Sequence, residues 1–337
     1  MSEHHLGPFV RRFLLEEVMA ERNLSPNTQK RYRDAIRLLF RFIAERHSTD
    51  PTCVTVEQVD AEMVRSFLIH LERERGNSIA TRNQRLTTLH SLFRFIGRLV
   101  PELIEHATHV QAISTRRTIT PAMPYLEKYE IDAPLASPNR RRPQGQRDYA
   151  LLLFLYNTGA RATEAAQVTV GDLNLDASPS VRFLGKGRKV RWCPLWPHTA
   201  SILADLLGTR VAGPEDDPAF RNVRGQPITR FGIHTLVARS VVKAAAAAPS
   251  LRDKTVSPHT IRHTTAVHLL RTGVDINTIR AWLGHVSLET TNRYAEIDLE
   301  MKAKALQTCA VTGQADVPEC THSGQADSEL MSFLSSL

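Results

Sequence analysis

The stretch Ser257–Ala295, SPHTIRHTTAVHLLRTGVDINTIRAWLGHVSLETTNRYA, contains the most regular structural signals of the sequence. Its opening Ser-Pro pair is typical of a helix start, and Gly273 marks the end of that helix. Asp275 can cap a second short helix, which Gly284 ends. The stretch therefore predicts two consecutive short helices and a third that begins near Ser287.

Four side chains in this stretch suit chemistry on a phosphate diester. His259 and Arg262 are three residues apart, so they share a helix face, while His285 follows a helix end and Tyr294 comes nine residues later. A guanidinium donates paired hydrogen bonds to phosphate oxygens. A tyrosine hydroxyl can attack phosphorus, but its pKa of about 10 requires help from a base or from nearby cations. The stretch supplies both kinds of help.

Together with two upstream segments, this stretch resembles the catalytic core of the tyrosine recombinase, or phage integrase, family. The upstream segments are NTGARATEA, which contains Arg161 and Glu164, and the hairpin-like LGKGRKVRWCPL, which contains Lys186. The family pattern is filled at all six positions in the expected order: Arg161, Lys186, His259, Arg262, His285 and Tyr294.

The resemblance implies a site-specific DNA recombinase or integrase, of a mobile element, that cleaves and rejoins strands through a 3′-phosphotyrosyl intermediate. Tyr294 is the expected nucleophile, and Lys186 the expected donor of a proton to the departing oxygen. His259 is the candidate base. Arg161, Arg262 and His285 would hold the phosphate. No cofactor is expected, because strand exchange conserves bond energy and no carboxylates at metal-binding spacing accompany the pattern.

The resemblance and the hydrophobic periodicity together predict a mainly α fold with a small β-hairpin or sheet, arranged as a two-domain DNA clamp. We expect a helical, SAM-like core-binding domain over 1–107, a linker and irregular start of the second domain over 108–146, and a mixed α+β catalytic domain over 147–307. Residues 308–337 read as a flexible tail that ends in a short apolar helix.

Basic side chains recur at helical spacing in the first domain, where Ser25-Pro26 predicts a helix start. The formal net charge of the chain is +8, which points to a polyanionic partner. Each arginine alone could simply be solvated. Taken together, six residues are predicted to contact the phosphates of double-stranded DNA, two of them on outward positions of a later helix: Lys30, Arg33, Arg37, Arg41, Arg82 and Arg85.

Family resemblance also implies assembly as a homo- or hetero-tetramer on two DNA sites. We expect the closing segment SELMSFLSSL to form a short helix that docks on a neighbouring protomer through one apolar face, made of Leu330, Met331, Phe333, Leu334 and Leu337. A frayed or self-docked tail is the alternative.

The composition predicts a reduced, cytoplasmic protein without a membrane segment. The four cysteines lack Cys-x-x-Cys spacing, and no apolar run approaches the roughly 20 residues that span a bilayer. Two other functions remain open. A catalytically silent DNA-binding regulator of the same fold should have lost part of the catalytic set, whereas a type IB topoisomerase-like enzyme would relax DNA without joining partners.

Overall fold

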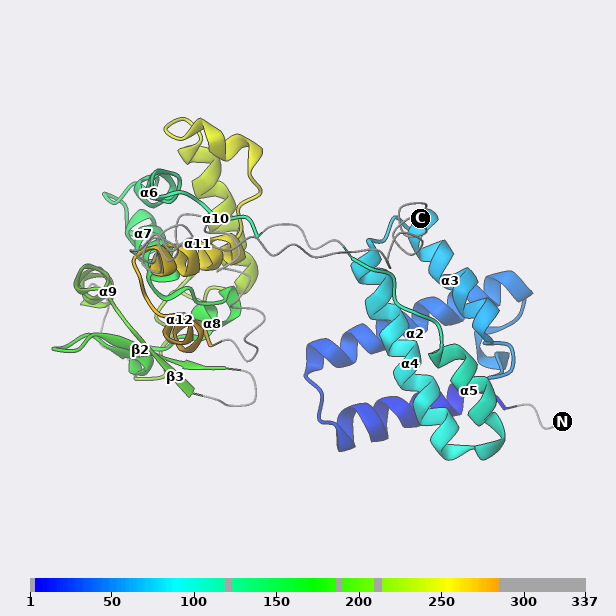
Figure 1. Cartoon of the computed structure of the whole chain (residues 1–337). Coiled ribbons are helices and arrows are strands. Elements are labelled where there is room, and N and C mark those ends of the chain that lie inside the picture. The colour runs from blue at the N-terminus through cyan, green and yellow to red at the C-terminus, as the bar shows by residue number, and fades with distance from the viewer. Residues whose placement is uncertain (1–3, 119–122, 186–189, 209–213, 285–337) are drawn as a thin grey trace, which may run out of the picture. The chain divides into compact units, whose positions relative to one another are not determined.

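The computed structural model describes residues 4–118, 123–185, 190–208 and 214–284. Within these residues the protein is mainly helical and contains a small antiparallel sheet (Figure 1), which confirms the predicted fold class. The chain divides into two compact units, residues 1–121 and 122–337. Each unit has a hydrophobic core of its own.

The first unit is built from helices whose starts are encoded locally. Ser25, Asp60 and Ser78 each accept a hydrogen bond from a backbone amide in the first turn of the helix that follows. The helices are α1 (Leu6–Arg12), the π-helical segment η1 (Phe13–Glu21), α2 (Pro26–His47), α3 (Ala61–Arg73), α4 (Ile79–Leu99) and α5 (Ile104–Gln111), with short 3₁₀ turns η2 (Pro51–Cys53) and η3 (Pro101–Leu103).

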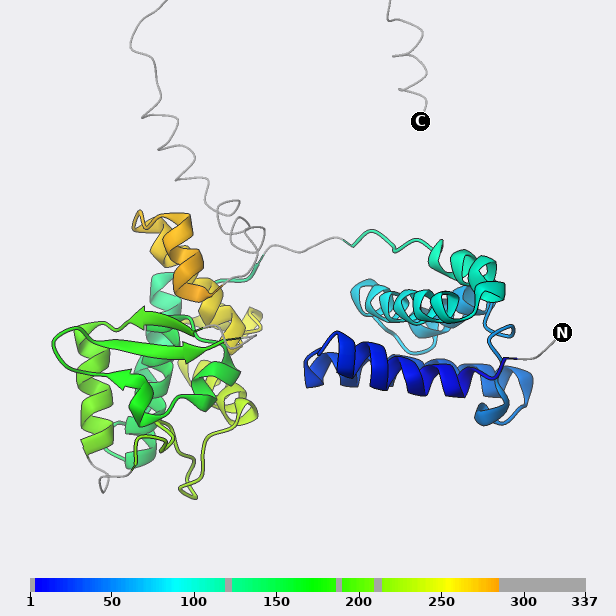
Figure 2. The same ribbon diagram turned by 90° about the horizontal axis from the view of Figure 1, so that it is seen from below.

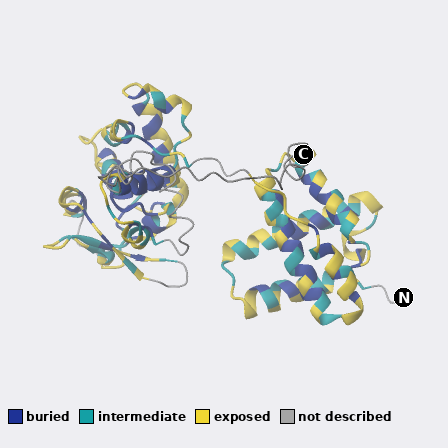
Figure 3. Ribbon diagram, in the orientation of Figure 1, coloured by how far each residue is buried: buried dark blue, intermediate teal, exposed yellow. Residues whose placement is uncertain are grey.

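Helix α4 organises the core of the first unit, since α2, α3 and α5 all pack against it. Its buried residues include Leu89 and Phe93, which recur at helical spacing. Figure 3 shows the result: buried residues line the inner faces of these helices, and exposed residues cover their outer faces. The outer face of α2 is therefore exposed within this unit.

The second unit surrounds the apolar helix α7, on which α6, α9 and α11 pack. Three strands form one antiparallel sheet in the order β1-β2-β3 (Figure 2), with Leu184 opposite Val190 at the end of the hairpin. The elements are α6 (Lys128–Ala136), α7 (Pro143–Thr158), α8 (Ala162–Gln167), η4 (Val170–Asp172), β1 (Leu173–Asn174), β2 (Ser180–Leu184), β3 (Val190–Pro194), α9 (Pro197–Gly208), α10 (Arg230–Ala244), η6 (Pro249–Asp253), α11 (Pro258–Arg271) and α12 (Ile276–Leu283).

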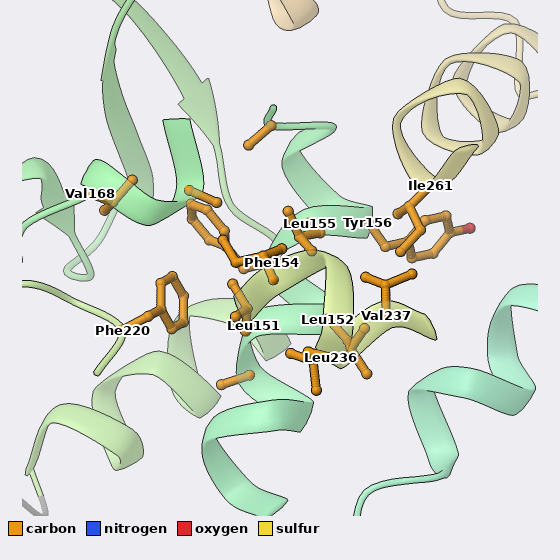
Figure 4. Packing of buried hydrophobic residues seen from close by; sticks show 14 of the residues in the cluster. Leu151, Leu152, Phe154, Leu155, Tyr156, Val168, Phe220, Leu236, Val237 and Ile261 are labelled. Atoms are coloured by element: carbon orange, nitrogen blue, oxygen red, sulfur yellow. The ribbon is translucent and has the colours of Figure 1, made fainter. Parts of the chain in front are cut away.

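The core of this unit explains the long apolar run in α7. Every residue from 150 to 158 is buried, and Figure 4 shows side chains of α7 such as Phe154 and Leu155 packed among residues of α10, α11 and the segment around Phe220. The last turn of α7 is thereby fixed in the centre of the unit. Since Gly159 follows directly, the segment that carries Arg161 starts from this rigid base.

The predicted helix signals in residues 257–284 are confirmed. Ser257 caps α11 by accepting from the Thr260 amide at 3.3 Å, and Asp275 caps α12 by accepting from Thr278 at 2.8 Å. Gly284 ends α12 in the left-handed region, with φ of 66°. Local capping chemistry therefore sets the ends of both helices.

Two local expectations differ from the structure. Residues 128–136, which we expected to be irregular, form α6 despite Pro134, because Glu130 reaches back to the Glu127 amide and caps the first turn. We expected a helix to begin at about residue 160 and to carry Arg161 in its first turn, but Arg161 lies at the cap position before α8. No helix among the described residues combines the length and the apolarity that crossing a membrane requires.

Candidate functional site

Arg161 lies at the junction of α7 and α8, where a left-handed Gly159 with φ of 58° turns the chain. Its backbone amide donates to Glu164 Oε2 at 2.9 Å, and its Nη1 donates to Glu164 Oε1 at 2.7 Å. The Arg161 side chain remains 44% exposed, whereas that of Glu164 is only 7% exposed. One carboxylate thus orients a guanidinium that a ligand can still reach.

Arg262, on α11, ties together two segments that are distant in the sequence. Its side chain is buried, and Nη1 donates to the Gly159 carbonyl at 2.7 Å while Nη2 donates to the Leu283 carbonyl at 2.6 Å. These carbonyls belong to the ends of α7 and α12, where a cation is favoured by the helix dipole. Arg262 therefore links the end of α7, which leads to Arg161, with the end of α12, which precedes residue 285.

His259 occupies the first turn of α11, one turn before Arg262. Partial burial, and then the positive charges of Arg262 and Arg161, lower the pKa of His259 below its ordinary value of 6.5. Its ring packs edge-on against His263, with 4.2 Å between the ring centroids. His259 is therefore neutral near pH 7 and able to accept a proton, and the three residues Arg161, His259 and Arg262 lie in one electrostatic environment.

Arg191, on β3, is a member of this cluster that the sequence analysis missed. Its Nη1 and Nη2 donate to the two carboxylate oxygens of Glu164 at 3.0 and 2.9 Å, and its Nε donates to the Trp282 carbonyl at 3.1 Å. A usable signal exists in the sequence. Arg191 is two residues from the buried Cys193 and therefore shares its inward face, where an arginine needs a partner.

Glu164 carries a negative charge in spite of its burial. Burial alone would raise the pKa of Glu164, but the hydrogen bonds and charge of Arg191, followed by those of Arg161, lower it from 4.5 to about 2. The carboxylate is ionised at any pH at which the protein would act. The cluster thus combines a fixed anion with cations from three separate segments.

The other three predicted catalytic residues, Lys186, His285 and Tyr294, lie outside the described residues. The structure does place the neighbours of two of them. Gly185 follows β2, and Gly284 lies so close to Arg191 that a Cβ atom there would be 2.9 Å from Arg191 Cδ. The described parts of the cluster are thus Arg161, His259 and Arg262, with Glu164 and Arg191 beside them.

Comparison with known proteins identifies the family of the chain. Residues 124–301 match the phage integrase family, and residues 11–98 match the phage integrase N-terminal SAM-like domain. A Sinorhizobium fredii protein described as a candidate integrase/recombinase is 35% identical over the full length of both chains. The chain belongs to the phage integrase family.

Other members of the phage integrase family are similar along most of their length. The tyrosine recombinase XerC of Pelobacter propionicus is 32% identical, and the match covers 85% of this chain and 92% of that one. Among solved structures, the XerH site-specific recombinase bound to its difH substrate matches with a TM-score of 0.67 at 20% identity, over 90% of this chain and 94% of that chain. The last comparison supports the fold alone.

In this integrase-family chain, four of the predicted DNA-binding residues form an exposed stripe on α2. Lys30, Arg33, Arg37 and Arg41 are all exposed on the face opposite the buried Ile36 and Leu39. Of these four residues, only Arg33 forms an ion pair with another described residue, at 3.1 Å from Asp34. The stripe therefore presents four exposed cations along one helix face, and its contact with DNA remains a prediction.

The expectation that Arg82 and Arg85 point outward is wrong. Arg82 is 6% exposed and pairs with Glu72 at 3.2 Å, because α4 turns this side chain toward α3. Arg85 is half-buried, and its desolvation lowers its pKa. Arg82 therefore lies on a face that helix packing covers, and Arg85 is partly covered, a property that spacing alone did not distinguish.

We predict that Glu164→Gln destabilises the second unit by about 3 kcal/mol at neutral pH, because it leaves two arginines without their shared anion. The effect depends on pH. Since folding lowers the pKa of Glu164, its stabilisation is complete above about 4.5 and is lost as the pH falls toward 2. Urea unfolding at pH 7, 5, 4 and 3 should show the gap to wild type narrowing below pH 4.5.

The matched control for this measurement is Glu127→Gln, which removes the exposed ion pair with Arg271. It should change the unfolding free energy by less than about 1 kcal/mol. Equal effects of the two substitutions would contradict the role assigned to Glu164.

Proposed function

We propose that this chain is a site-specific DNA recombinase that cuts and rejoins strands through a covalent bond to Tyr294. The observation that carries this proposal is the grouping of Arg161, at the start of α8, with His259 and Arg262, in the first two turns of α11. Two permanent cations next to a potential base match the needs of phosphate transfer. The filled family pattern supplies the nucleophile.

The reaction proceeds by in-line attack of the Tyr294 hydroxyl on the scissile phosphorus. Its proton passes to His259, the bond from phosphorus to the 5′ oxygen breaks, and Lys186 donates a proton to that oxygen. Arg161 and Arg262, with His285 as a further donor, balance the charge that develops on the phosphate. Loss of one such donor costs about 10²–10³ in rate. Attack of a 5′ hydroxyl from a partner strand reverses these steps and completes strand exchange.

The DNA substrate is supported by the relatives. One structural neighbour is the integrase of the transposon Tn1549 in complex with a circular-intermediate DNA, with a TM-score of 0.68 at 17% identity. We propose that this chain also moves a mobile element, and that it acts in the cytoplasm on DNA sequences that flank its own gene.

The first test of this function is Tyr294→Phe. Wild-type protein incubated with fragments of the flanking DNA should form adducts that survive denaturing electrophoresis. The variant should form none, because phenylalanine lacks the attacking oxygen, and its DNA affinity should stay within about twofold of wild type. Sequencing the trapped fragments identifies the site, which the proposal places at the ends of the element. Persistent adducts in the variant would refute the assignment of the nucleophile.

DNA binding by the α2 stripe gives a second test. Replacing Lys30, Arg33, Arg37 and Arg41 with glutamine should weaken binding and reduce the slope of log affinity against log salt by about 0.9 for each phosphate that is no longer neutralised. Fluorescence anisotropy at several salt concentrations measures this slope. The control is Arg11→Gln with Arg12→Gln, two exposed arginines of α1 that should leave the slope unchanged. If both variants behave alike, the stripe is only a solvated surface.

We also propose that the protein acts as a tetramer on two DNA sites, with the C-terminal apolar segment of one protomer docked on the next. Deletion of residues 325–337 should then reduce the mass of the DNA-bound assembly, measured by sedimentation, because the deletion removes the apolar interface between protomers. A full-length chain with Ser335→Ala and Ser336→Ala serves as the control. An unchanged assembly in the deletion would exclude this docking.

A further inference from the structure

Arg191 contacts both of the segments that lead to predicted phosphate-binding residues. Through Nη1 and Nη2 it binds the carboxylate of Glu164, which orients Arg161, and through Nε it binds the Trp282 carbonyl, three positions before His285. Its own side chain is only 12% exposed. Because other residues cover most of the Arg191 side chain, it can act on its neighbours better than on DNA.

The position of the Arg191 guanidinium is fixed from two sides. Its Cζ lies 4.2 Å from the centroid of the Phe183 ring, a distance typical of cation–π stacking. On another side Gly284 approaches so closely that a Cβ would lie 2.9 Å from Arg191 Cδ. A planar, stacked guanidinium with a bidentate partner is a geometry that lysine cannot reproduce.

The carboxylate of Glu164 is saturated by four hydrogen bonds. Oε1 accepts from Arg161 Nη1 and Arg191 Nη1, and Oε2 accepts from the Arg161 amide and Arg191 Nη2. A carboxylate has about four acceptor positions, so no further donor fits well. Because Arg191 occupies two of them, the Arg161 side chain makes only one bond to Glu164, and its other N–H groups have no partner among the described residues.

We propose that Arg191 is a positioning residue for strand cleavage: it neutralises Glu164 so that Arg161 can turn its remaining donors toward the phosphate, and it fixes the end of α12 that leads to His285. This inference rests on the proposed recombinase function. It assigns Arg191 no contact with DNA.

Loss of Arg191 has a specific consequence for Arg161. Glu164 would keep its charge and regain two vacant acceptor positions, and the nearest guanidinium able to fill them is that of Arg161. A bidentate pair between these two residues would draw Arg161 away from the phosphate. Removing the charge of Glu164 as well should release Arg161 again.

The experiment measures single-turnover cleavage by the full-length protein of a nicked duplex that carries the sequence trapped by wild type. The variants are Arg191→Gln, Arg191→Lys and the double variant Arg191→Gln/Glu164→Gln. The matched control is Arg182→Gln, which removes an exposed arginine of the same hairpin that pairs with Asp172 at 2.9 Å. DNA affinity and thermal midpoint are measured for each, so that binding, folding and cleavage are separated.

Arg191→Gln should lower the cleavage rate of bound DNA about 100-fold, a loss typical of a misplaced catalytic group, while DNA affinity changes less than about threefold. Arg191→Lys should lie between this variant and wild type. The double variant should recover about tenfold over Arg191→Gln, and Arg182→Gln should match wild type. Recovery through a second substitution distinguishes positioning from a merely structural role.

Cleavage by Arg191→Gln at the rate of Arg182→Gln would overturn the inference, as would a double variant no faster than Arg191→Gln. If Arg191→Gln does not fold, the decision falls to Arg191→Lys, and a wild-type cleavage rate in that variant refutes the inference. The proposed function fails separately, and the inference with it, if the wild-type protein forms no adduct at all.

Discussion

The shared carboxylate of Glu164 is the interaction on which the rest of the candidate site depends. A buried anion is stable only with full compensation, and here two arginines and one backbone amide provide it. Because one arginine precedes α8 and the other lies on β3, the same charge that orients Arg161 also joins the sheet to the helical part of the unit. The contacts that stabilise this region of the fold are therefore also the contacts that position the site.

Arg262 extends this connection to the third segment of the site. Its bonds to the carbonyls of Gly159 and Leu283 satisfy the ends of α7 and α12, so its burial stabilises the backbone as well as adding charge. A guanidinium suits this role because it presents several donors in fixed directions. The cost of burying a cation is thus offset by backbone groups that would otherwise lack partners.

Sequence patterns predicted those features that depend on a few adjacent residues. Ser257, Asp275 and Gly284 set the ends of α11 and α12 through local hydrogen bonds and backbone conformation. The family pattern predicted that Arg161, His259 and Arg262 belong to one site. The pattern did not reveal what depends on tertiary contacts. Arg82 has the spacing of a surface residue but lies against Glu72 of another helix, and Arg191 gains its role only from Glu164, 27 residues earlier.

Because Gly284 lies so close to Arg191, the residue at each of these positions limits which substitutions the other can accept. Any side chain at 284 would meet both the strain of a left-handed backbone and the Arg191 side chain. Shortening residue 191 would relieve the collision but would leave Glu164 with one cation. Neither position can drift alone without passing through a less favourable intermediate, so related chains are expected to keep or exchange this pair together.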